Sequence, residues 1–203
     1  MKYVLILLAS IMFSCQEKKV AEEVPVAPEP VVEAKIDVAD KVLIIEGSSI
    51  GNIKVGQPVD SLQIQLGVPD LSDSAMGKAW LTWFNNPSDS ITGKYELNIF
   101  TKYKNRELIE KIVGQVRVTS PDFKTADGCS TGMALSDLIV KYPNIKVAAT
   151  FMNLKTNNVV SLYDTRSGIA FEVEDGFCTA IIIYDKRQNL LDDYRTFRPD
   201  LRT

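Results

Sequence analysis

The 203-residue sequence contains three cysteines and no histidine. The cysteine thiols are therefore the first side chains to consider for covalent chemistry. The lack of histidine excludes Ser-His-Asp and Cys-His nucleophile pairs, histidine general bases and the commonest zinc ligand. Cys129 and Cys178 alone fall short of the ligand number of a zinc site, so we expect no bound metal. The thiols therefore favour acylation or a disulfide over catalysis.

Carboxylates are the remaining candidates for acid–base chemistry, as in enzymes that hydrolyse glycosides with two acidic side chains. Five aspartates fall near expected caps and turns, where local hydrogen bonding accounts for them: Asp60, Asp70, Asp73, Asp127 and Asp137. Asp192 and Asp193 fall in a polar tail, and Ser136 and Lys141 do not face each other at their spacing. Phosphate loops, nucleophile elbows and dinucleotide fingerprints do not occur. We therefore expect a protein that is not an enzyme and binds no cofactor.

Charge and composition narrow the class of protein further. Lys and Arg number 23 and Asp and Glu number 26, so the net charge is −3. Nucleic-acid-binding proteins usually carry a strong basic excess, so we expect no nucleic-acid partner. Hydrophobic residues make up 45% and charged residues 24%, which is typical of a globular domain.

Cys15 ends an N-terminal segment that has the features of a secretion signal. Lys2 is followed by a mostly apolar run over residues 4–13, which is too short to span a bilayer as a helix. The pair Ser14-Cys15 resembles the processing site of bacterial lipoproteins, although Met12 and Phe13 depart from the common pattern. The alternative is a soluble secreted protein that is cleaved elsewhere.

The lipoprotein resemblance implies a signal peptide over residues 1–14 and a lipid anchor on Cys15, in which acyl chains such as palmitate attach the protein to a membrane of the bacterial cell envelope. Gln16 is not the aspartate that commonly retains lipoproteins in the inner membrane, which favours the outer membrane over the inner membrane. Residues 15–41 contain three prolines and no aromatic residue, so we expect a disordered tether. A folded domain is expected over residues 42–203.

The folded region contains one pattern used twice. Gly56 matches Gly132 and Leu62 matches Leu138, at an offset of 76 residues. In each copy, apolar residues at helical spacing precede runs that alternate like strands. The copies cover about 48–119 and 127–185. They predict an α+β fold of two tandem helix-plus-antiparallel-meander units, with the helices packed on one face of the sheet.

Six strands are expected from the alternation and from the turns between them. They are Lys78–Phe84, Lys94–Tyr103, Leu108–Thr119, Val159–Tyr163, Ile169–Val173 and Cys178–Tyr184. The helix-then-meander pattern resembles the fold family of β-lactamase inhibitor protein, which has two such units, and of the small lipoproteins of the outer-membrane protein assembly machine, which have one. The motifs that carry the resemblance are Ile53–Gly56 with Leu66–Pro69, and Gly168–Phe171 with Asp175-Gly176. The resemblance implies protein binding without catalytic residues.

Strand alternation also predicts which side chains occupy the face of the sheet without helices. They are Phe100, Lys102, Val113, Arg117, Glu172 and Tyr184. Aromatic and arginine side chains among charges are typical of protein interfaces, so we expect this open face to bind an unidentified protein partner. An ordinary solvated face is the alternative. Trp80 and Trp83 lie on opposite faces of one strand, so one of them is expected to point outward.

Two further questions stay open at this point. Cys129 and Cys178 form either a disulfide, which an oxidising compartment permits, or two small core residues. The protein is alternatively an inhibitor of a secreted or periplasmic enzyme, in which case the loop Asn85–Gly93 is the candidate to enter a cleft. A hydrolase that uses carboxylates alone is the third and weakest alternative.

Overall fold

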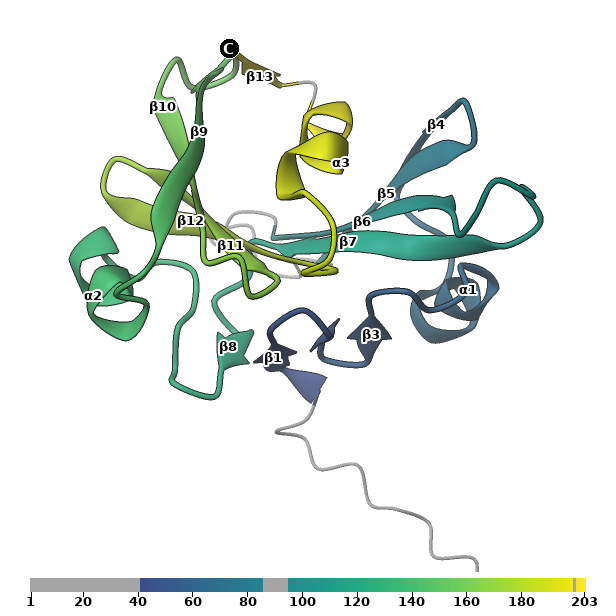
Figure 1. Ribbon diagram of the computed structural model, residues 1–203, viewed down its shortest axis with the longest axis horizontal. Helices are drawn as coiled ribbons and strands as arrows, with labels where there is room; N and C mark the ends of the chain where they lie inside the picture. The colour runs from purple at the N-terminus through teal and green to yellow at the C-terminus, as the bar shows by residue number, and fades with distance from the viewer. Residues whose placement is uncertain (1–40, 86–94, 199) are drawn as a thin grey trace, which may run out of the picture. The chain divides into compact units, whose positions relative to one another are not determined.

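A nine-stranded antiparallel sheet dominates the computed structural model, which describes residues 41–85, 95–198 and 200–203 (Figure 1). The strand order is β13-β9-β10-β11-β12-β7-β6-β5-β4. The strands are β4 (Leu71–Ala75), β5 (Lys78–Phe84), β6 (Glu96–Tyr103), β7 (Lys111–Val118), β9 (Lys146–Asn153), β10 (Val159–Asp164), β11 (Ile169–Glu174), β12 (Phe177–Tyr184) and β13 (Leu201–Arg202). The six expected strands are present, with ends that differ by a few residues, and Lys94 lies outside the described residues.

A small sheet and three helices complete the described part of the chain. The small sheet has the order β3-β2-β1-β8, with β1 (Leu43–Ile45), β2 (Ser49–Ile50), β3 (Ile53–Lys54) and β8 (Lys124–Thr125). The helices are α1 (Asp60–Leu66), α2 (Leu135–Lys141) and α3 (Leu190–Phe197). The chain is therefore a mixed α+β protein in which most elements are strands.

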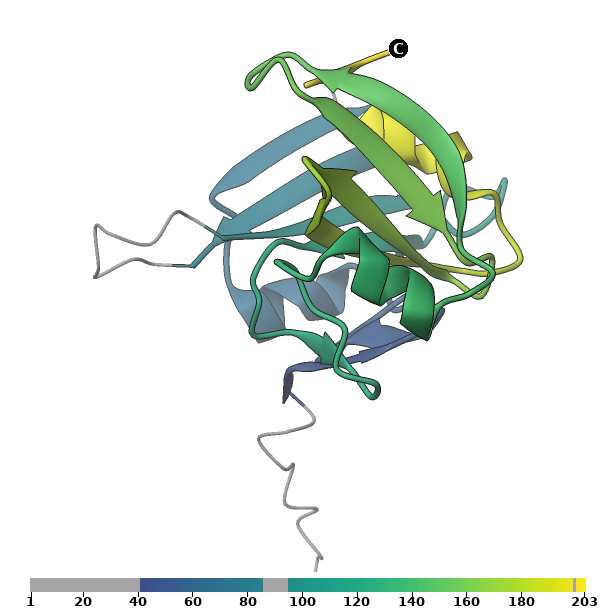
Figure 2. The same ribbon diagram turned by 90° about the vertical axis from the view of Figure 1, so that its left-hand side faces the viewer.

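The side of the large sheet that faces α1, α2 and the small sheet carries the main apolar core; we call it the α1–α2 face (Figures 1 and 2). Leu62 of α1 and Leu138 of α2 are buried there against strand residues such as Ile99, Val116 and Ile181. Each short helix thus contributes one fully buried leucine to the shared core. Apolar burial of this kind is the main stabilising term for the fold.

The third helix corrects the expectation that all helices pack on one face. α3 lies on the opposite side of the large sheet, which we call the α3 face (Figure 1). Leu190 and Tyr194, one helical turn apart, are buried there against Phe151 and Tyr184. The Asn189 side chain accepts a hydrogen bond from the Leu191 N–H and caps the helix. The segment interpreted as a polar tail is therefore a packed helix.

Two β-bulges correct the predicted alternation. Phe100 pairs with Gln115 but Thr101 pairs with Val113, so Gly114 is an extra residue in β7. In the same way, Glu172 pairs with Ala180 but Val173 pairs with Cys178. Each bulge shifts the alternation by one residue. Val113 therefore lies in the core of the α1–α2 face, although alternation predicted it on the open face, and Cys178 lies in the same core.

Candidate binding cleft

The expected open face of the sheet is not open, because α3 and the residues after it cover much of it. Exposure is 1% for Phe100, 6% for Arg117, 1% for Glu172 and 3% for Tyr184. Val113 is buried on the other face, and the amino group of the partly buried Lys102 contacts Asp193 of α3 and Gln188. The expectation of a flat, exposed set of side chains is wrong, although Phe100, Lys102, Arg117, Glu172 and Tyr184 do share one face.

A cleft of about 720 Å³ occupies the rest of the α3 face. Alternate residues of four neighbouring strands line its floor: Leu71 and Asp73 of β4, Trp80, Thr82 and Phe84 of β5, Glu96 and Asn98 of β6, and Arg117 of β7, with Thr119 just after it. Thr82 pairs with Asn98, and Asn98 pairs with Arg117 in the strand register. The period-two geometry of strands explains why every second residue faces the cleft.

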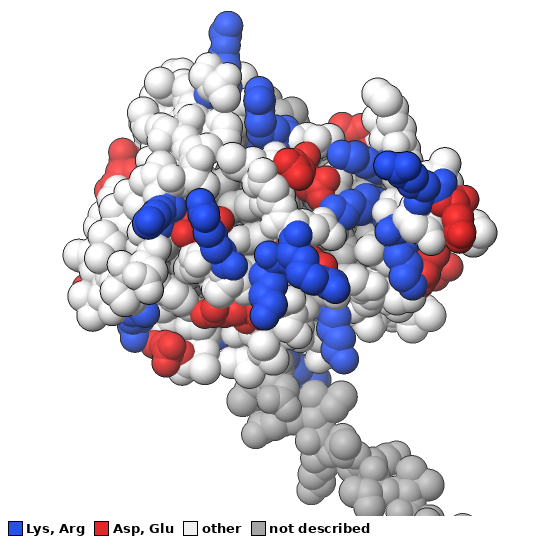
Figure 3. All heavy atoms as spheres, viewed as in Figure 1, with Lys and Arg blue, Asp and Glu red and all other residues white. Residues whose placement is uncertain are grey.

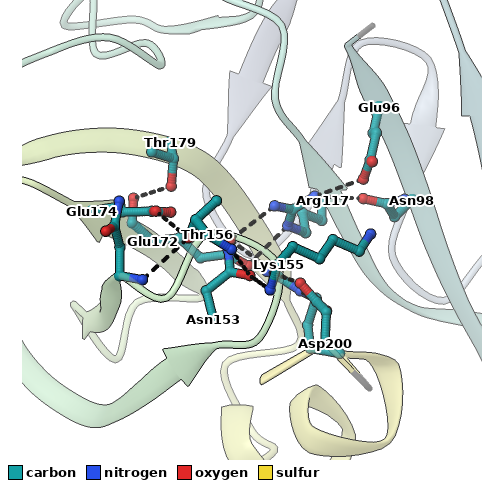
Figure 4. A network of polar contacts seen from close by, with 12 residues as sticks. Glu96, Asn98, Arg117, Asn153, Lys155, Thr156, Glu172, Glu174, Thr179 and Asp200 are labelled. Carbon is teal, nitrogen blue, oxygen red and sulfur yellow. Dashed lines mark hydrogen bonds and ion pairs between the residues drawn. The ribbon is translucent and has the colours of Figure 1, made fainter. Parts of the chain in front are cut away.

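The opposite wall of the cleft comes from the second half of the chain. It includes Asn153 and Lys155 at the end of β9, Glu172 and Glu174 of β11, Thr179 of β12, and Arg198 and Asp200 after α3. Figure 4 shows the contact between the two sides, in which Arg117 of the floor is hydrogen-bonded to Glu172 of this wall. The cleft therefore joins segments that are far apart in the sequence.

A buried charge network holds the two sides of the cleft together. Nε of Arg117 donates a hydrogen bond to Oε1 of Glu172, and Nη2 donates one to Oε2, each at 2.8 Å. Arg198 donates through Nη1 to the same carboxylate, and the Tyr194 hydroxyl donates to it at 3.0 Å. The Glu172 oxygens therefore accept four hydrogen bonds. Bidentate pairs of this kind are among the strongest polar contacts in proteins.

Glu172 is held in its charged form by this network. Burial alone would raise the pKa of Glu172, but the guanidinium groups of Arg117 and Arg198 lower that pKa to about 2. Both guanidinium groups have further acceptors: Nη1 of Arg117 donates to Asn98 at 2.7 Å and to Glu96 at 3.2 Å. Arg198 donates to both oxygens of Asp200 at 2.8 Å. A carboxylate with this many donors is a structural anion and a poor proton donor or base near neutral pH.

The charges around the cleft do not balance. The acidic lining residues are Asp73, Glu96, Glu172, Glu174 and Asp200, and the basic ones are Arg117, Lys155 and Arg198. The acids exceed the bases by two, since five are set against three. Aromatic side chains of Trp80, Phe84 and Tyr95 also line the cleft. Carboxylates beside aromatic rings suit a cationic or neutral group and disfavour an anion.

The tryptophans of β5 differ from the expectation that one points outward. Trp83 is buried in the core of the α1–α2 face, and Trp80 is half-buried where it lines the cleft. They do lie on opposite faces of the strand. The loop considered for an inhibitor, Asn85–Gly93, lies outside the described residues except for Asn85, and the same holds for Cys15 and for the tether up to residue 40.

Cys129 and Cys178 are both buried and carry free thiols in the structure. The second alternative, two small core residues, describes this state, and the disulfide is not formed. Burial raises the pKa of the Cys129 thiol and raises that of Cys178 to about 12. Both thiols are therefore protonated and unreactive near neutral pH.

Two general features of the described residues bear on the class of protein. Within residues 41–85, 95–198 and 200–203, His, Cys, Asp and Glu side chains form no group of three suited to a metal ion. In the same part of the chain, no helix has the length and hydrophobicity to cross a membrane. Comparison of the chain with protein-family models, with curated proteins and with solved structures finds no match.

Sequence reasoning placed Arg117 and Glu172 on one face but missed Asn98, Tyr194 and Arg198 as their partners. Asn98 has a detectable signal, since it is a polar residue at a strand position that alternates with Leu97 and Ile99. Tyr194 and Arg198 have none of comparable strength, because both belong to the segment interpreted as a polar tail.

Proposed function

We propose that this chain is a lipid-anchored, non-catalytic binding protein of the bacterial cell envelope, and that the cleft on the α3 face receives a segment of a protein partner. Cys15 carries the lipid, residues 16–41 form the tether, and the outer membrane is the favoured location. The observation that carries the proposal is a cleft of about 720 Å³ whose two sides are joined by a buried network of paired charges. This volume lies in the range of ligand sites in proteins.

The non-catalytic part of the proposal rests on the chemistry of the cleft. The most buried carboxylate, Glu172, accepts four hydrogen bonds and keeps its charge. Cys178 borders the cleft, but its side chain is buried in the core of the α1–α2 face and the pKa of its thiol is raised, so it is a poor nucleophile. The most buried carboxylate of the cleft and the nearby thiol thus favour recognition over acid–base or nucleophilic catalysis.

The charge of the cleft favours a basic partner segment. Asp73 is exposed on the edge strand β4, and Glu174 is partly exposed on the facing wall. A lysine or arginine that enters between them gains carboxylate partners and the faces of nearby aromatic rings. Among the described strands β4 is an edge of the large sheet, so its outer backbone groups can pair with an extended segment.

We also infer that the domain arose from two copies of one helix-plus-meander unit, at about 48–119 and 127–185. Equivalent backbone contacts support this inference. The Gly56 N–H donates to the Val113 carbonyl, and the Gly132 N–H donates to the Cys178 carbonyl, each at 2.7 Å. Val113 N–H in turn donates to Gln57, and Cys178 N–H donates to Met133. Both glycines have φ of +84°, a conformation that glycine adopts easily.

The duplication bears on function because the bulges are equivalent too. In each copy one strand has an extra residue directly after Val113 or Cys178. Phe100 and Glu172 are the last residues of the facing strands that pair before this bulge, so they occupy matching positions in the two copies. One copy has an aromatic side chain where the other has the central carboxylate of the network. Divergence at a matching position is expected where one copy has acquired a separate role.

Inhibition of a secreted or periplasmic enzyme is the second candidate function. Phe84 and Tyr95, which flank residues 86–94, closely border the cleft, and the Tyr95 N–H donates to the Asn85 side chain at 2.7 Å. The described residues on both sides of the loop Asn85–Gly93 therefore lie at the cleft. An inhibitor would present this loop together with the cleft rim to its target.

The test reverses charge at the rim of the cleft and measures binding of a partner. A photo-crosslinker at Leu71, which is exposed on β4, is used to capture the partner from detergent-solubilised envelope, and the partner is then purified. Asp73→Lys with Glu174→Lys should weaken its binding to the full chain by at least about tenfold. Glu107→Lys with Asp137→Lys is the matched control, because both acids are exposed, do not line the cleft and give the same change in charge.

The outcomes separate the candidate functions. Loss of binding only in the rim variant supports the cleft as the site, and equal loss in both variants contradicts it. If the captured partner is an enzyme whose activity falls when the chain is added, the inhibitor function replaces the first proposal. If the chain itself converts a glycoside or another substrate, the non-catalytic assignment is wrong.

A further inference from the structure

A second hollow, of about 420 Å³, lies outside the cleft, where the connection from β12 to α3 passes the start of β9 and the turn between β10 and β11. Three basic side chains line it: Lys146, Arg166 and Lys186. We call this site the basic hollow. Figure 3 shows Lys and Arg side chains gathered over the middle of the molecular face that the β12–α3 connection and the β10–β11 turn cross in Figure 1.

The three basic side chains have no acidic partner among the described residues. Neighbouring cations do have partners: Lys102 pairs with Asp193, and Arg187 pairs with Asp185 at 2.7 Å. Lys146, Arg166 and Lys186 belong to no ion pair in the described part of the chain, and all three are exposed. Their charges are therefore available to a ligand.

One acidic residue, Asp164, lines the basic hollow, and its contacts are largely within the protein. Its Oδ1 accepts a hydrogen bond of 2.6 Å from the Tyr184 hydroxyl and one of 3.0 Å from the Arg166 N–H. Three cations and one anion leave the hollow with a local charge of +2, in a chain whose net charge is −3. The hollow is thus a positive site on a negative protein, and it attracts anions.

We propose that the basic hollow binds a phosphate-bearing group. Its cations come from three separate segments and surround one volume, so a tetrahedral anion can contact several of them at once. Phosphate oxygens accept charge-assisted hydrogen bonds from both lysine and arginine. A volume of about 420 Å³ is larger than the anion alone needs and lies in the range of small-molecule sites, so the phosphate belongs to a larger molecule.

Two sources supply such a group: the headgroup of an anionic phospholipid, and a soluble phosphate monoester. The basic hollow is separate from the cleft, whose acidic lining suits a basic segment. The proposal of phosphate binding in the hollow therefore does not depend on the proposal of partner binding in the cleft. Glycerol 3-phosphate is the soluble probe. Non-ionic detergent micelles with and without phosphatidylglycerol are the lipid probe.

The experiment measures the affinity of the full chain, purified in non-ionic detergent, for both probes by calorimetry and by micelle co-elution. The triple variant Lys146→Gln, Arg166→Gln, Lys186→Gln should weaken binding by at least about tenfold. The matched control is Lys54→Gln, Arg106→Gln, Lys124→Gln, which removes the same charge from exposed sites outside the hollow. It should change the affinity by less than about twofold.

Each outcome decides the proposal. Binding of glycerol 3-phosphate that only the hollow variant loses supports the site with a soluble phosphate as its ligand. Binding to phosphatidylglycerol micelles alone, lost in the hollow variant alone, supports the site with a lipid headgroup. If neither probe binds, or if both triple variants lose binding equally, the basic hollow is not a phosphate site.

Discussion

The α1–α2 face of the large sheet is stabilised by apolar packing, whereas the α3 face combines a smaller apolar cluster under α3 with a buried charge network. Adjacent residues of one strand contribute to the two faces. Phe171 of β11 packs into the apolar core of the α1–α2 face, with its ring centroid 5.1 Å from that of Tyr142. Glu172, the next residue, pairs with Arg117 and Arg198 on the α3 face. Apolar packing forms a continuous core on the α1–α2 face, whereas directional contacts between fixed charges can line a cleft without filling it.

The largest effect is expected on the apolar face. Phe171→Ala should lower the free energy of unfolding by about 3–5 kcal/mol, because a fully buried aromatic ring is removed and leaves a cavity. Urea denaturation followed by circular dichroism measures this loss. The loss should be the same at neutral and at acidic pH, and a loss that disappears in acid would contradict a purely apolar role.

A similar but pH-dependent effect is expected one residue further along the strand. Glu172→Gln should cost about 3 kcal/mol at neutral pH, because two buried guanidinium groups lose their shared anion. The same urea titration measures it. Glu174→Gln is the control on the same strand, and its partial exposure limits the expected cost to about 0.5 kcal/mol. Equal costs for both variants would contradict the central place of Glu172.

The pH dependence of the unmodified protein gives a third test. The pKa of Glu172 is about 2 in the folded chain, against an ordinary value of 4.5, so the unfolded chain binds a proton at higher pH than the folded one does. Its contribution of about 3 kcal/mol is therefore complete above pH 4.5 and is lost as the pH falls toward 2. Unfolding free energies measured across this range should show the slope, and Glu172→Gln should remove that part of it.

A smaller effect is expected where α3 is attached to the sheet. Asp193 is buried and contacts the amino groups of Lys102 and of Lys78, the latter at 3.5 Å. Asp193→Asn should cost about 1.5 kcal/mol, because it weakens charge-assisted contacts but keeps the shape of the side chain. Asp192→Asn, on an exposed side chain of the same helical turn, is the control. Hydrogen exchange at α3 should rise in the first variant alone.

The strands could be predicted because their signals are local. Alternation along Leu97, Ile99 and their neighbours, and turn residues such as Asp175-Gly176, depend on a few adjacent positions. Bulges break this rule, since one extra residue reverses the face of everything beyond it. Gly114 was an available warning, because a glycine inside a strand often marks a bulge. Its absent side chain leaves room for Phe100 and Lys102, which lie 3.1–3.2 Å from the place of a Cβ.

The candidate site could be predicted only in part, because its contacts are distant in sequence. Arg117 and Glu172 were assigned correctly to a shared face, but they are 55 residues apart, and no spacing rule joins such a pair. The cover over that face was missed because α3 is short and mostly polar outside Leu190 and Tyr194. The face of the sheet that the sequence predicts to be open is therefore partly covered by α3, a segment with a weak pattern of apolar residues.

The order of the network along the chain has a consequence for biosynthesis. Glu172 is made 22 residues before Tyr194 and 26 residues before Arg198, and both are donors to its carboxylate. While a nascent chain emerges from its N-terminal end, β11 and β12 can pair before these donors exist. Until α3 docks, Glu172 has Arg117 as its cationic partner and remains open to water. Docking of α3 is therefore the step that removes this carboxylate from water.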